Sequence, residues 1–199
     1  MRWSVFASAY GSIEGGMELS AKDSVQLRSE KFVLRDFKPV KALYKEAFPK
    51  DERLPLPLLW LLSKKKKEEA RVYLHHGEVV GMTFTIDSKE TCFLFYIAIA
   101  SRWRSRGYGS EILRNVVKRA EGKPVSLFIE TMDDLDAPNY AQRKRRLAYY
   151  EKNGFVQTGW QVGVKKPELD VLSNASDFSL EQGKALVKGT PFKLFQNGC

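Results

Sequence analysis

The sequence predicts an α/β fold, with a mixed, twisted sheet of about six to seven strands and helices on both faces. The run Phe93–Ala100 is almost wholly apolar, as in a strand that is buried on both faces. Apolar residues then recur with helical spacing at Ile112, Leu113 and Val116, and a second apolar run follows at Val125–Thr131. Strand, helix and strand joined by short links predict a right-handed parallel crossover.

The length and composition indicate one globular domain. The chain has 199 residues, and we expect a flexible leader at residues 1–24 followed by a single domain at residues 25–199. The longest apolar stretch, Leu54–Leu62, is too short to span a membrane and contains two prolines. Cys92 and Cys199 are too few for a disulfide framework, and no metal-ligand spacing is present. We therefore expect a cytoplasmic protein that binds neither metal nor membrane.

The charge is strongly basic, with a formal net charge of +9. Much of it lies in three clusters, Lys64–Lys67, Arg102–Arg106 and Arg143–Arg146. Such a surplus attracts nucleic acid, acidic membranes or a polyanionic cofactor, and charge alone does not choose among them.

The elements before the crossover follow from local patterns. A helix is expected at Pro57–Lys67, and its final lysines are interpreted as a solvated helix end. The leucines of this helix are interpreted as core residues or as the wall of an acceptor pocket. His76 and Gly77 form the hairpin turn. We expect a strand at Leu27–Leu34, helices at Phe37–Phe48 and Pro57–Lys67, and a hairpin of Ala70–His75 with Glu78–Asp87.

The later elements are read in the same way. Gly122 caps the helix predicted at Ser110–Glu121, and Gly154 caps the helix predicted at residues 139–152. A Ser179–Gln182 capping box opens the last predicted helix. We expect helices at Ser110–Glu121, at residues 139–152 and at Leu180–Lys188, and strands at Phe155–Trp160 and Leu169–Leu172.

The turn between the first buried strand and its helix is a candidate anion site. Gly107 and Gly109 let the backbone approach a ligand closely, and the helix start offers free N–H groups. A P-loop is excluded because its second glycine, lysine and hydroxyl residue are missing. A dinucleotide fingerprint is also disfavoured, because Ile112 stands where its third glycine belongs. A phosphate-bearing ligand is therefore expected here.

Two segments together resemble the GNAT acyltransferases. Residues Arg104–Gly109 match the signature Q/R-x-x-G-x-G/A of that family, in the strand–turn–helix context that it requires. The segment Tyr150–Phe155 resembles the family's second block, Y-x-x-x-G-F, one strand later and in the family's order. The resemblance covers roughly residues 25–165. It implies the GNAT fold, split between its two central parallel strands where acetyl-CoA enters.

The resemblance also implies which residues hold acetyl-CoA. The strand Tyr96–Ser101 would lie beside the pantetheine arm, and a backbone N–H near Ile97 to Ile99 could stabilise the thioester oxyanion. Many relatives carry an asparagine six or seven residues before the tyrosine, and Lys144 and Arg143 stand there in this chain. Asn139 lies a few residues too early to substitute in register, and is kept as a candidate cofactor contact. The arginines Arg143–Arg146 either contact CoA phosphates or form an exposed helix face. The candidate cofactor contacts are Ile97, Ala98, Ile99, Arg104, Ser105, Arg106, Gly107, Tyr108, Gly109, Ser110 and Asn139.

The implied reaction needs a base and an acid. An attacking amine must lose a proton, and Glu130, at the end of the second buried strand, is the first candidate base, ahead of Asp133 and Glu46. A structural ion pair is the alternative role for Glu130. By resemblance, the Tyr150 phenol protonates the departing CoA thiolate, and core or cofactor packing is its alternative role.

We therefore predict an acetyl-CoA-dependent N-acetyltransferase that acetylates a primary amine by direct attack. The acceptor is a small molecule, a polyamine-like amine or a peptide amine, and a homodimer is compatible with the family. The alternatives are a basic nucleic-acid-binding module, which leaves both motifs unexplained, and an acyl-CoA-binding sensor without catalysis.

Overall fold

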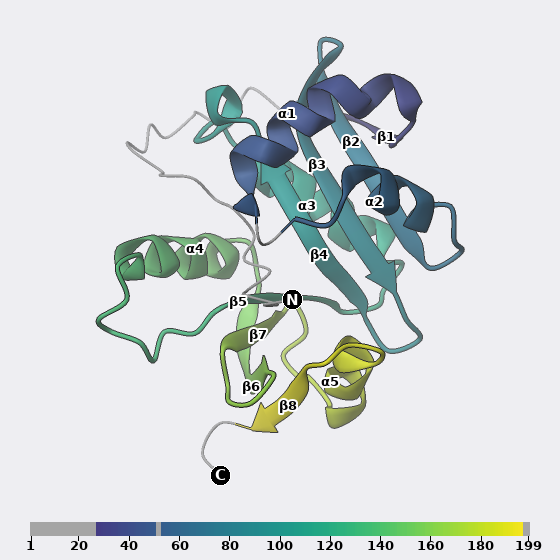
Figure 1. Cartoon of the computed structure of the whole chain (residues 1–199). Helices are drawn as coiled ribbons and strands as arrows, with labels where there is room; N and C mark the ends of the chain where they lie inside the picture. Colours follow the sequence, from purple (N-terminus) through teal and green to yellow (C-terminus); the bar gives the residue numbers. More distant parts are fainter. Residues whose placement is uncertain (1–26, 51–52, 197–199) are drawn as a thin grey trace.

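The computed structural model describes residues 27–50 and 53–196, so the predicted leader lies outside the described residues. A single twisted sheet runs through the molecule in the strand order β1-β2-β3-β4-β5-β7-β6-β8 (Figure 1). The strands are β1 (Arg28–Lys31), β2 (Glu68–His75), β3 (Glu78–Asp87), β4 (Cys92–Ile99), β5 (Val125–Glu130), β6 (Val156–Gly163), β7 (Leu169–Ser173) and β8 (Lys193–Gln196). The helices are α1 (Phe37–Ala47), α2 (Leu56–Leu62), α3 (Tyr108–Arg119), α4 (Tyr140–Lys152) and α5 (Leu180–Val187).

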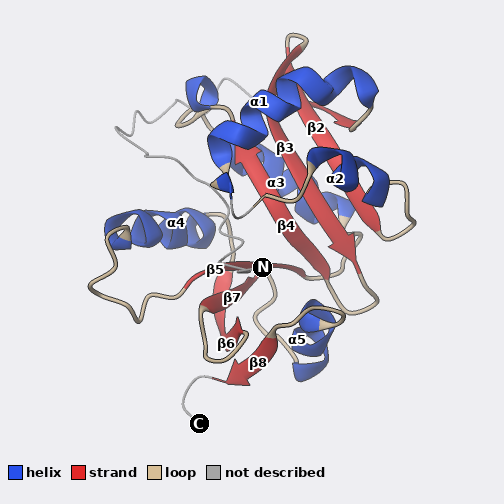
Figure 2. Cartoon of the chain, viewed as in Figure 1, coloured by secondary structure: helices blue, strands red, loops and turns tan. Residues whose placement is uncertain are grey.

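The mixed sheet with helices on both faces is confirmed. Val40 of α1, Leu59 of α2 and Leu186 of α5 belong to one buried cluster, whereas Ile112 of α3 and Tyr150 of α4 belong to another. Figure 2 shows α1 and α2 in front of the long strands and α3 behind them. The sheet therefore separates two apolar cores.

The sheet has eight strands rather than the six to seven predicted. The additional strand is β8, which pairs antiparallel with β6 between Lys193↔Gly163 and Gln196↔Trp160. Four residues at a sheet edge leave only a short alternating pattern, and the pairing partner lies thirty residues earlier in the chain, so local periodicity could not identify it.

The first strand is shorter than predicted. Only Arg28–Lys31 pairs with β2, although the Phe32 amide still donates to the Ala70 carbonyl at 2.9 Å. The Val33 amide then donates to Asp36 Oδ2 at 2.9 Å, which starts a 3-10 turn at Leu34–Asp36. The expected strand at Leu27–Leu34 is therefore wrong over residues 32–34, because this local side-chain bond redirects the chain.

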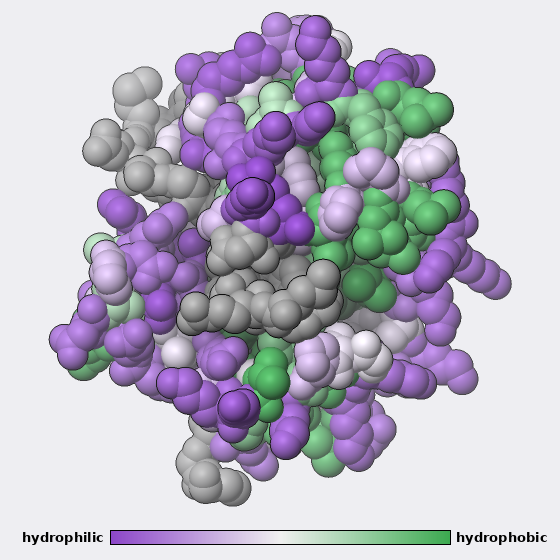
Figure 3. All heavy atoms as spheres, viewed as in Figure 1, coloured by the Kyte–Doolittle hydropathy of each residue, from purple (hydrophilic) through white to green (hydrophobic). Residues whose placement is uncertain are grey.

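The second helix also ends early. It stops at Leu62, and the lysines follow in a turn closed by Lys64 N to Leu61 O at 3.1 Å and Lys65 N to Leu62 O at 2.9 Å. Leu59 is fully buried, whereas Leu58 and Leu61 are 39% and 60% exposed. Figure 3 shows apolar side chains gathered on the surface over α2. The prediction that Lys64–Lys67 belong to the helix is wrong.

Helix α3 lies unusually close to the sheet. Ile112 is fully buried, and a Cβ built on Gly81 of β3 would lie 2.6 Å from its Cδ1 atom and 2.8 Å from the Ala98 carbonyl oxygen. Glycine at position 81 therefore makes room for the bulky Ile112. The small residue that lets the helix and the sheet pack closely thus lies on β3 and not on α3. None of the helices in the described part of the chain is long and apolar enough to span a membrane.

Candidate active site

The central parallel strands touch only where they begin. Strands β4 and β5 pair at Cys92↔Val125 and Phe93↔Ser126, and no later residue of β4 pairs with β5. On its other edge, β4 pairs with β3 along its whole length. The predicted split between the two central strands is therefore confirmed, and it opens toward their carboxyl ends.

A bulge in β4 marks the point where the opening begins. Phe84 pairs with Tyr96 but Thr85 pairs with Leu94, so the register shifts there and Phe95 is the extra residue of a bulge in β4. A bulge bends its strand and increases the local twist. The bulge immediately follows the last pair with β5, and we infer that it helps β4 to diverge from β5.

Beyond the bulge, alternate amides of β4 face the opening. The Ala100 amide donates to Val80 O at 2.9 Å, so it points toward β3. Since successive amides of a strand point to opposite edges, the N–H groups of Ile97 and Ile99 point toward β5, and that of Ala98 toward β3. The Ala98 side chain lies in the α1 core, whereas Ile97 and Ile99 lie in the α3 core.

The glycine elbow, residues Arg104–Gly109, has the backbone of an anion cradle. Ser105 and Gly107 have φ of 57° and 82°, and Gly107 is the N-cap of α3. Within the described residues, no acceptor is recorded for the six amide N–H groups from Ser105 to Ser110. Alternating right- and left-handed residues before a helix start make a concavity of N–H groups that attracts anions. The elbow therefore presents free backbone N–H groups at a helix start, as an anion-binding site does.

The side chain of Arg104 ties the elbow to the scaffold. Its Nε donates to Ile99 O at 3.0 Å and its Nη2 donates to Glu46 Oε1 at 3.1 Å. The same Glu46 oxygen accepts from the Ser101 amide at 2.8 Å. Glu46, one of the three predicted bases, therefore joins α1 to the elbow.

Arg106 of the elbow and Arg102 just before it both lie over the ring of Trp103. The guanidinium carbons of Arg102 and Arg106 lie 5.6 and 5.7 Å from its ring centroid. The ring also packs edge-on against His75 at 5.4 Å and Tyr108 at 5.2 Å. This aromatic support, which the sequence did not predict, holds the basic side chains beside the cradle.

Tyr150 lies in the same core as the cleft strand and the elbow. It is fully buried, and its ring packs edge-on against Phe155 at 5.8 Å. One cluster contains Tyr150 together with Ile97 and Ile99 of β4 and Tyr108 of the elbow. The structure therefore brings the predicted acid, strand and cradle into one contiguous region.

Glu130, at the end of β5, is held by Asn139 and Arg146, and Arg143 Nε lies 3.7 Å from its Oε1 atom. One carboxylate oxygen accepts from Asn139 Nδ2 at 2.7 Å, and the other pairs with the Arg146 guanidinium. Glu130 and Arg146 are 8% and 4% exposed. This arrangement is the structural ion pair that the sequence left open, and it joins β5 to α4.

Arg143 extends the same network. It donates from Nε to Asn139 Oδ1 and from Nη1 to Thr131 O, both at 2.9 Å. The predicted exposed helix face is therefore wrong for Arg143 and Arg146, which turn inward, while Lys144 and Arg145 are exposed. Asn139 lies at the N-cap of α4, bonded to protein groups on both ends of its amide.

A second polar cluster was missed. Gln161 Nε2 donates to Asp170 Oδ1 at 2.8 Å and to Asp133 Oδ2 at 3.0 Å. Asp170 also accepts from the Met132 amide at 3.3 Å, and burial raises its pKa above the ordinary value. The sequence feature that could have revealed this cluster is Asp170, the only charged residue in the largely apolar run Leu169–Ser173. Among the described residues, no three His, Cys, Asp or Glu side chains are placed to hold a metal ion.

Comparisons with known proteins agree with this geometry. Residues 37–155 match the family described as "Acetyltransferase (GNAT) family". No curated protein matches the chain. Among solved structures, a protein from Bacteroides thetaiotaomicron described as from the GNAT family is 18% identical with a TM-score of 0.61, covering 80% of this chain and 93% of its own.

Two further structures share the fold. The ribosomal-protein-S18-alanine N-acetyltransferase of Escherichia coli is 16% identical with a TM-score of 0.55, covering 78% of this chain and 97% of its own. A Salmonella typhimurium protein solved with its cofactor acetyl-CoA is 14% identical with a TM-score of 0.57, covering 77% of this chain and 96% of its own.

Proposed function

Because the chain belongs to the GNAT family of acetyltransferases, an acetyl-CoA-using family, we propose that it moves the acetyl group of acetyl-CoA directly to a primary amine. The observation that carries this proposal is the juxtaposition of two features of β4. Its edge toward β5 is unpaired after Phe93, and the cradle of free amides follows its carboxyl end. One strand thus offers backbone groups to the pantetheine arm and leads to a site for the pyrophosphate.

In this proposal the elbow holds the pyrophosphate through the amides of Ser105 to Ser110. Arg104 positions the elbow, and Arg106 adds positive charge beside it. The amides of Ile97 and Ile99 bind the pantetheine arm or the thioester oxygen, where negative charge develops during attack. The small side chain of Ala98 leaves room in the cleft. Asn139 positions Glu130 through a hydrogen bond and does not itself contact acetyl-CoA.

The acid is Tyr150. A departing CoA thiolate needs a proton, and a buried phenol close to the cleft strand can supply it. Because a phenol is ordinarily less acidic than a thiol, the transfer must be helped by orientation and by product release. Tyr150 is therefore expected to affect turnover more than acetyl-CoA affinity.

The base is proposed to be Glu130, working on a water or on the amine at the end of β5. An alkylammonium with an ordinary pKa of about 10 must lose a proton before it attacks. The Arg146 pair competes with this role, since both carboxylate oxygens are engaged. Glu130→Gln separates the two roles. If Glu130 is the base, the loss of rate in this variant is largest at neutral pH and shrinks near pH ~10, where much of the amine is already neutral. If its role is purely structural, stability falls and the loss of rate is the same at both pH values.

For the acceptor we propose an amine on a small molecule or a peptide. The Escherichia coli neighbour is named for acetylation of an alanine of a ribosomal protein, which is one such amine. The test is release of CoA thiol from acetyl-CoA across a panel of polyamines, amino acids and peptide N-termini, with the product identified by mass. Binding of acetyl-CoA without thiol release for any amine would support the non-catalytic sensor instead.

A further inference from the structure

A basic cavity lies at the end of α3 that is farthest from the elbow. Its volume is about 680 Å³, within the range of about 300–1,000 Å³ typical of small-ligand sites. It is lined by the last turns of α3, including Val116 and Arg119, by the start of β2 and by Lys64–Lys67. Since α3 has 12 residues and rises about 1.5 Å per residue, roughly 18 Å of helix separates the cavity from the cradle.

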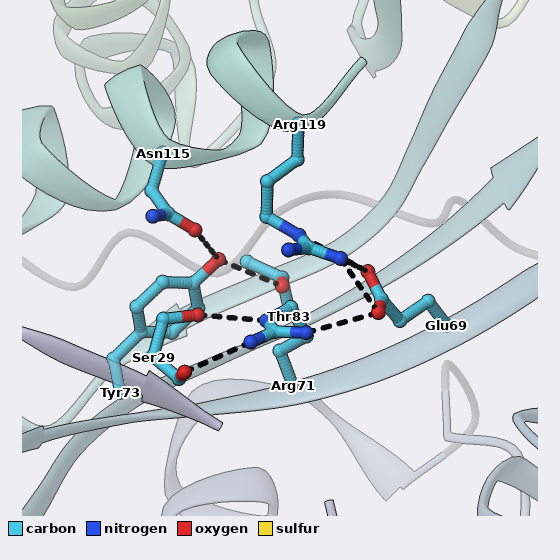
Figure 4. A network of polar contacts seen from close by, with 7 residues as sticks. All are labelled: Ser29, Glu69, Arg71, Tyr73, Thr83, Asn115 and Arg119. Atoms are coloured by element: carbon cyan, nitrogen blue, oxygen red, sulfur yellow. Dashed lines mark hydrogen bonds and ion pairs between the residues drawn. The ribbon is translucent and has the colours of Figure 1, made fainter. Parts of the chain in front are cut away.

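One wall of the cavity is a fixed cationic network (Figure 4). Arg71 donates to Ser29 Oγ at 2.7 Å, to Ser29 O at 2.8 Å and to Glu69 Oε1 at 2.9 Å. Arg119, on α3, donates to both oxygens of the same Glu69 at 2.8 Å. The Glu69 carboxylate therefore pairs with two guanidinium groups, which leaves one positive charge without a counter-charge. The Arg71 side chain is held in place in this network and is only 11% exposed.

The cavity is also lined by lysines that have no recorded ion-pair partner. Eight basic and four acidic side chains line the cavity. Lys123 pairs with Asp87, but no carboxylate lies within ion-pair distance of Lys31 or of Lys64–Lys67 in the described part of the chain. The end of the seven-residue α2 carries about half a negative charge, which a single lysine would offset. The remaining lysines repel one another, and an anion between them would relieve that repulsion.

The described residues that line the cavity offer no aromatic stacking surface. Tyr73 O–H donates to Asn115 Oδ1 at 3.3 Å and lies 3.3 Å from Thr83 Oγ1 (Figure 4). Tyr73 and the other lining aromatic residue, Phe32, are 0% and 2% exposed, so neither ring face is available to a nucleobase. Single-stranded nucleic acids are normally held by stacking on such rings, whereas phosphate groups need only the cations.

We propose that this cavity is a second anion site, distinct from the elbow, which binds a small molecule carrying two or more phosphate groups. Lys65, Lys66 and Lys67 contact its phosphates from the loop, and Arg119 does so from α3. Lys64 is turned partly aside, since its Nζ lies 4.8 Å over the Trp60 ring. The site goes beyond acetyl transfer, and its binding does not depend on that activity.

The test is a calorimetric titration of inorganic tripolyphosphate into the full chain at low salt, with acetyl-CoA held just above one equivalent to fill the elbow. We expect one tripolyphosphate per chain. The Lys65→Glu/Lys66→Glu variant should bind it at least tenfold more weakly. The control, Lys188→Glu/Lys193→Glu, changes the net charge equally at exposed lysines elsewhere and should alter affinity less than twofold.

Three outcomes would overturn the proposal. They are no binding to the wild type, equal losses in the two charge variants, and loop-dependent binding of a single-stranded RNA oligonucleotide without binding of tripolyphosphate. Melting temperatures of both variants exclude a folding defect, and Lys65→Ala/Lys66→Ala provides a milder change at the same place. If the acetyltransferase proposal fails and acetyl-CoA leaves the elbow empty, tripolyphosphate can bind there as well, but only the cavity site loses affinity in Lys65→Glu/Lys66→Glu and keeps it in the control variant.

Discussion

The Arg104 guanidinium donates to the Ile99 carbonyl oxygen at 3.0 Å and thereby joins the last peptide of β4 to the elbow. The cleft strand and the cradle are thus positioned by one side chain. A second bond from the same guanidinium reaches Glu46 on α1. Arg104, the first residue of the elbow, therefore has a positioning role in this chain.

Replacing Arg104 should weaken acetyl-CoA binding. The Arg104→Met variant keeps the stem but loses the bonds to Ile99 and Glu46, and hydrogen bonds of a charged group contribute about 1.5–3 kcal/mol each in sheltered sites. We expect about tenfold weaker binding by calorimetry. Arg102→Met is the control, because its ion pair with Glu78 is solvent-exposed. Equal effects of the two variants would show that only local charge matters.

Removal of the Tyr150 hydroxyl should slow turnover. For Tyr150→Phe we expect thiol release to fall about 10- to 100-fold while acetyl-CoA affinity stays within about twofold. Tyr149→Phe, one residue away on α4, serves as the control. A Tyr150→Phe variant that turns over at the wild-type rate would exclude Tyr150 as the acid.

Breaking the buried pair between β5 and α4 should be costly. Arg146→Met removes the nearer cation from the buried Glu130 carboxylate, although Arg143 Nε stays 3.7 Å from its Oε1 atom, so we expect a loss toward the lower end of the about 3–5 kcal/mol typical of a broken buried pair. Urea unfolding should show this loss, and the double variant with Glu130→Gln should recover part of it. Arg145→Met, at the exposed neighbouring position, should change the free energy of unfolding by less than about 0.5 kcal/mol. Similar losses in both single variants would contradict the assignment.

Asp170 should make stability depend on pH. Burial, opposed by the Gln161 hydrogen bond, raises its pKa in the folded state above the unfolded value. Its contribution is therefore largest below the unfolded pKa of about 4 and is lost as pH rises through the folded pKa. The free energy of unfolding of the wild type, minus that of Asp170→Asn, should fall as pH rises from about 4. A difference that stays constant or rises would contradict this sign.

The central unit of the fold could be predicted from local sequence. The continuous apolar run at Phe93–Ala100 and the helical spacing through Val116 indicate β4 and α3, and the left-handed Gly107 is where the motif requires it. These features depend on neighbours in the chain, so a single sequence displays them.

What could not be predicted depends on partners distant in sequence. The bulge at Phe95 is defined only by its register against β3, and the inward turn of Arg146 only by the position of Glu130. The arginine run looked like a solvated face because charge patterns do not reveal which side of a helix meets a strand end. The role of Gly81 in making room for Ile112 could likewise not be predicted, because it depends on how β3 and α3 pack together.

The most direct test of the central claim compares two glycines at opposite ends of α3. Gly107 and Gly122 have φ of 82° and 85°, so valine at either position incurs a similar backbone strain of at least about 1–2 kcal/mol. A Cβ at Gly122 meets nothing within 4 Å. If the elbow is the CoA cradle, Gly107→Val abolishes acetyl-CoA binding in calorimetry and remains folded, while Gly122→Val binds as the wild type does. Equal acetyl-CoA affinity in the two variants would show that the elbow is only a turn.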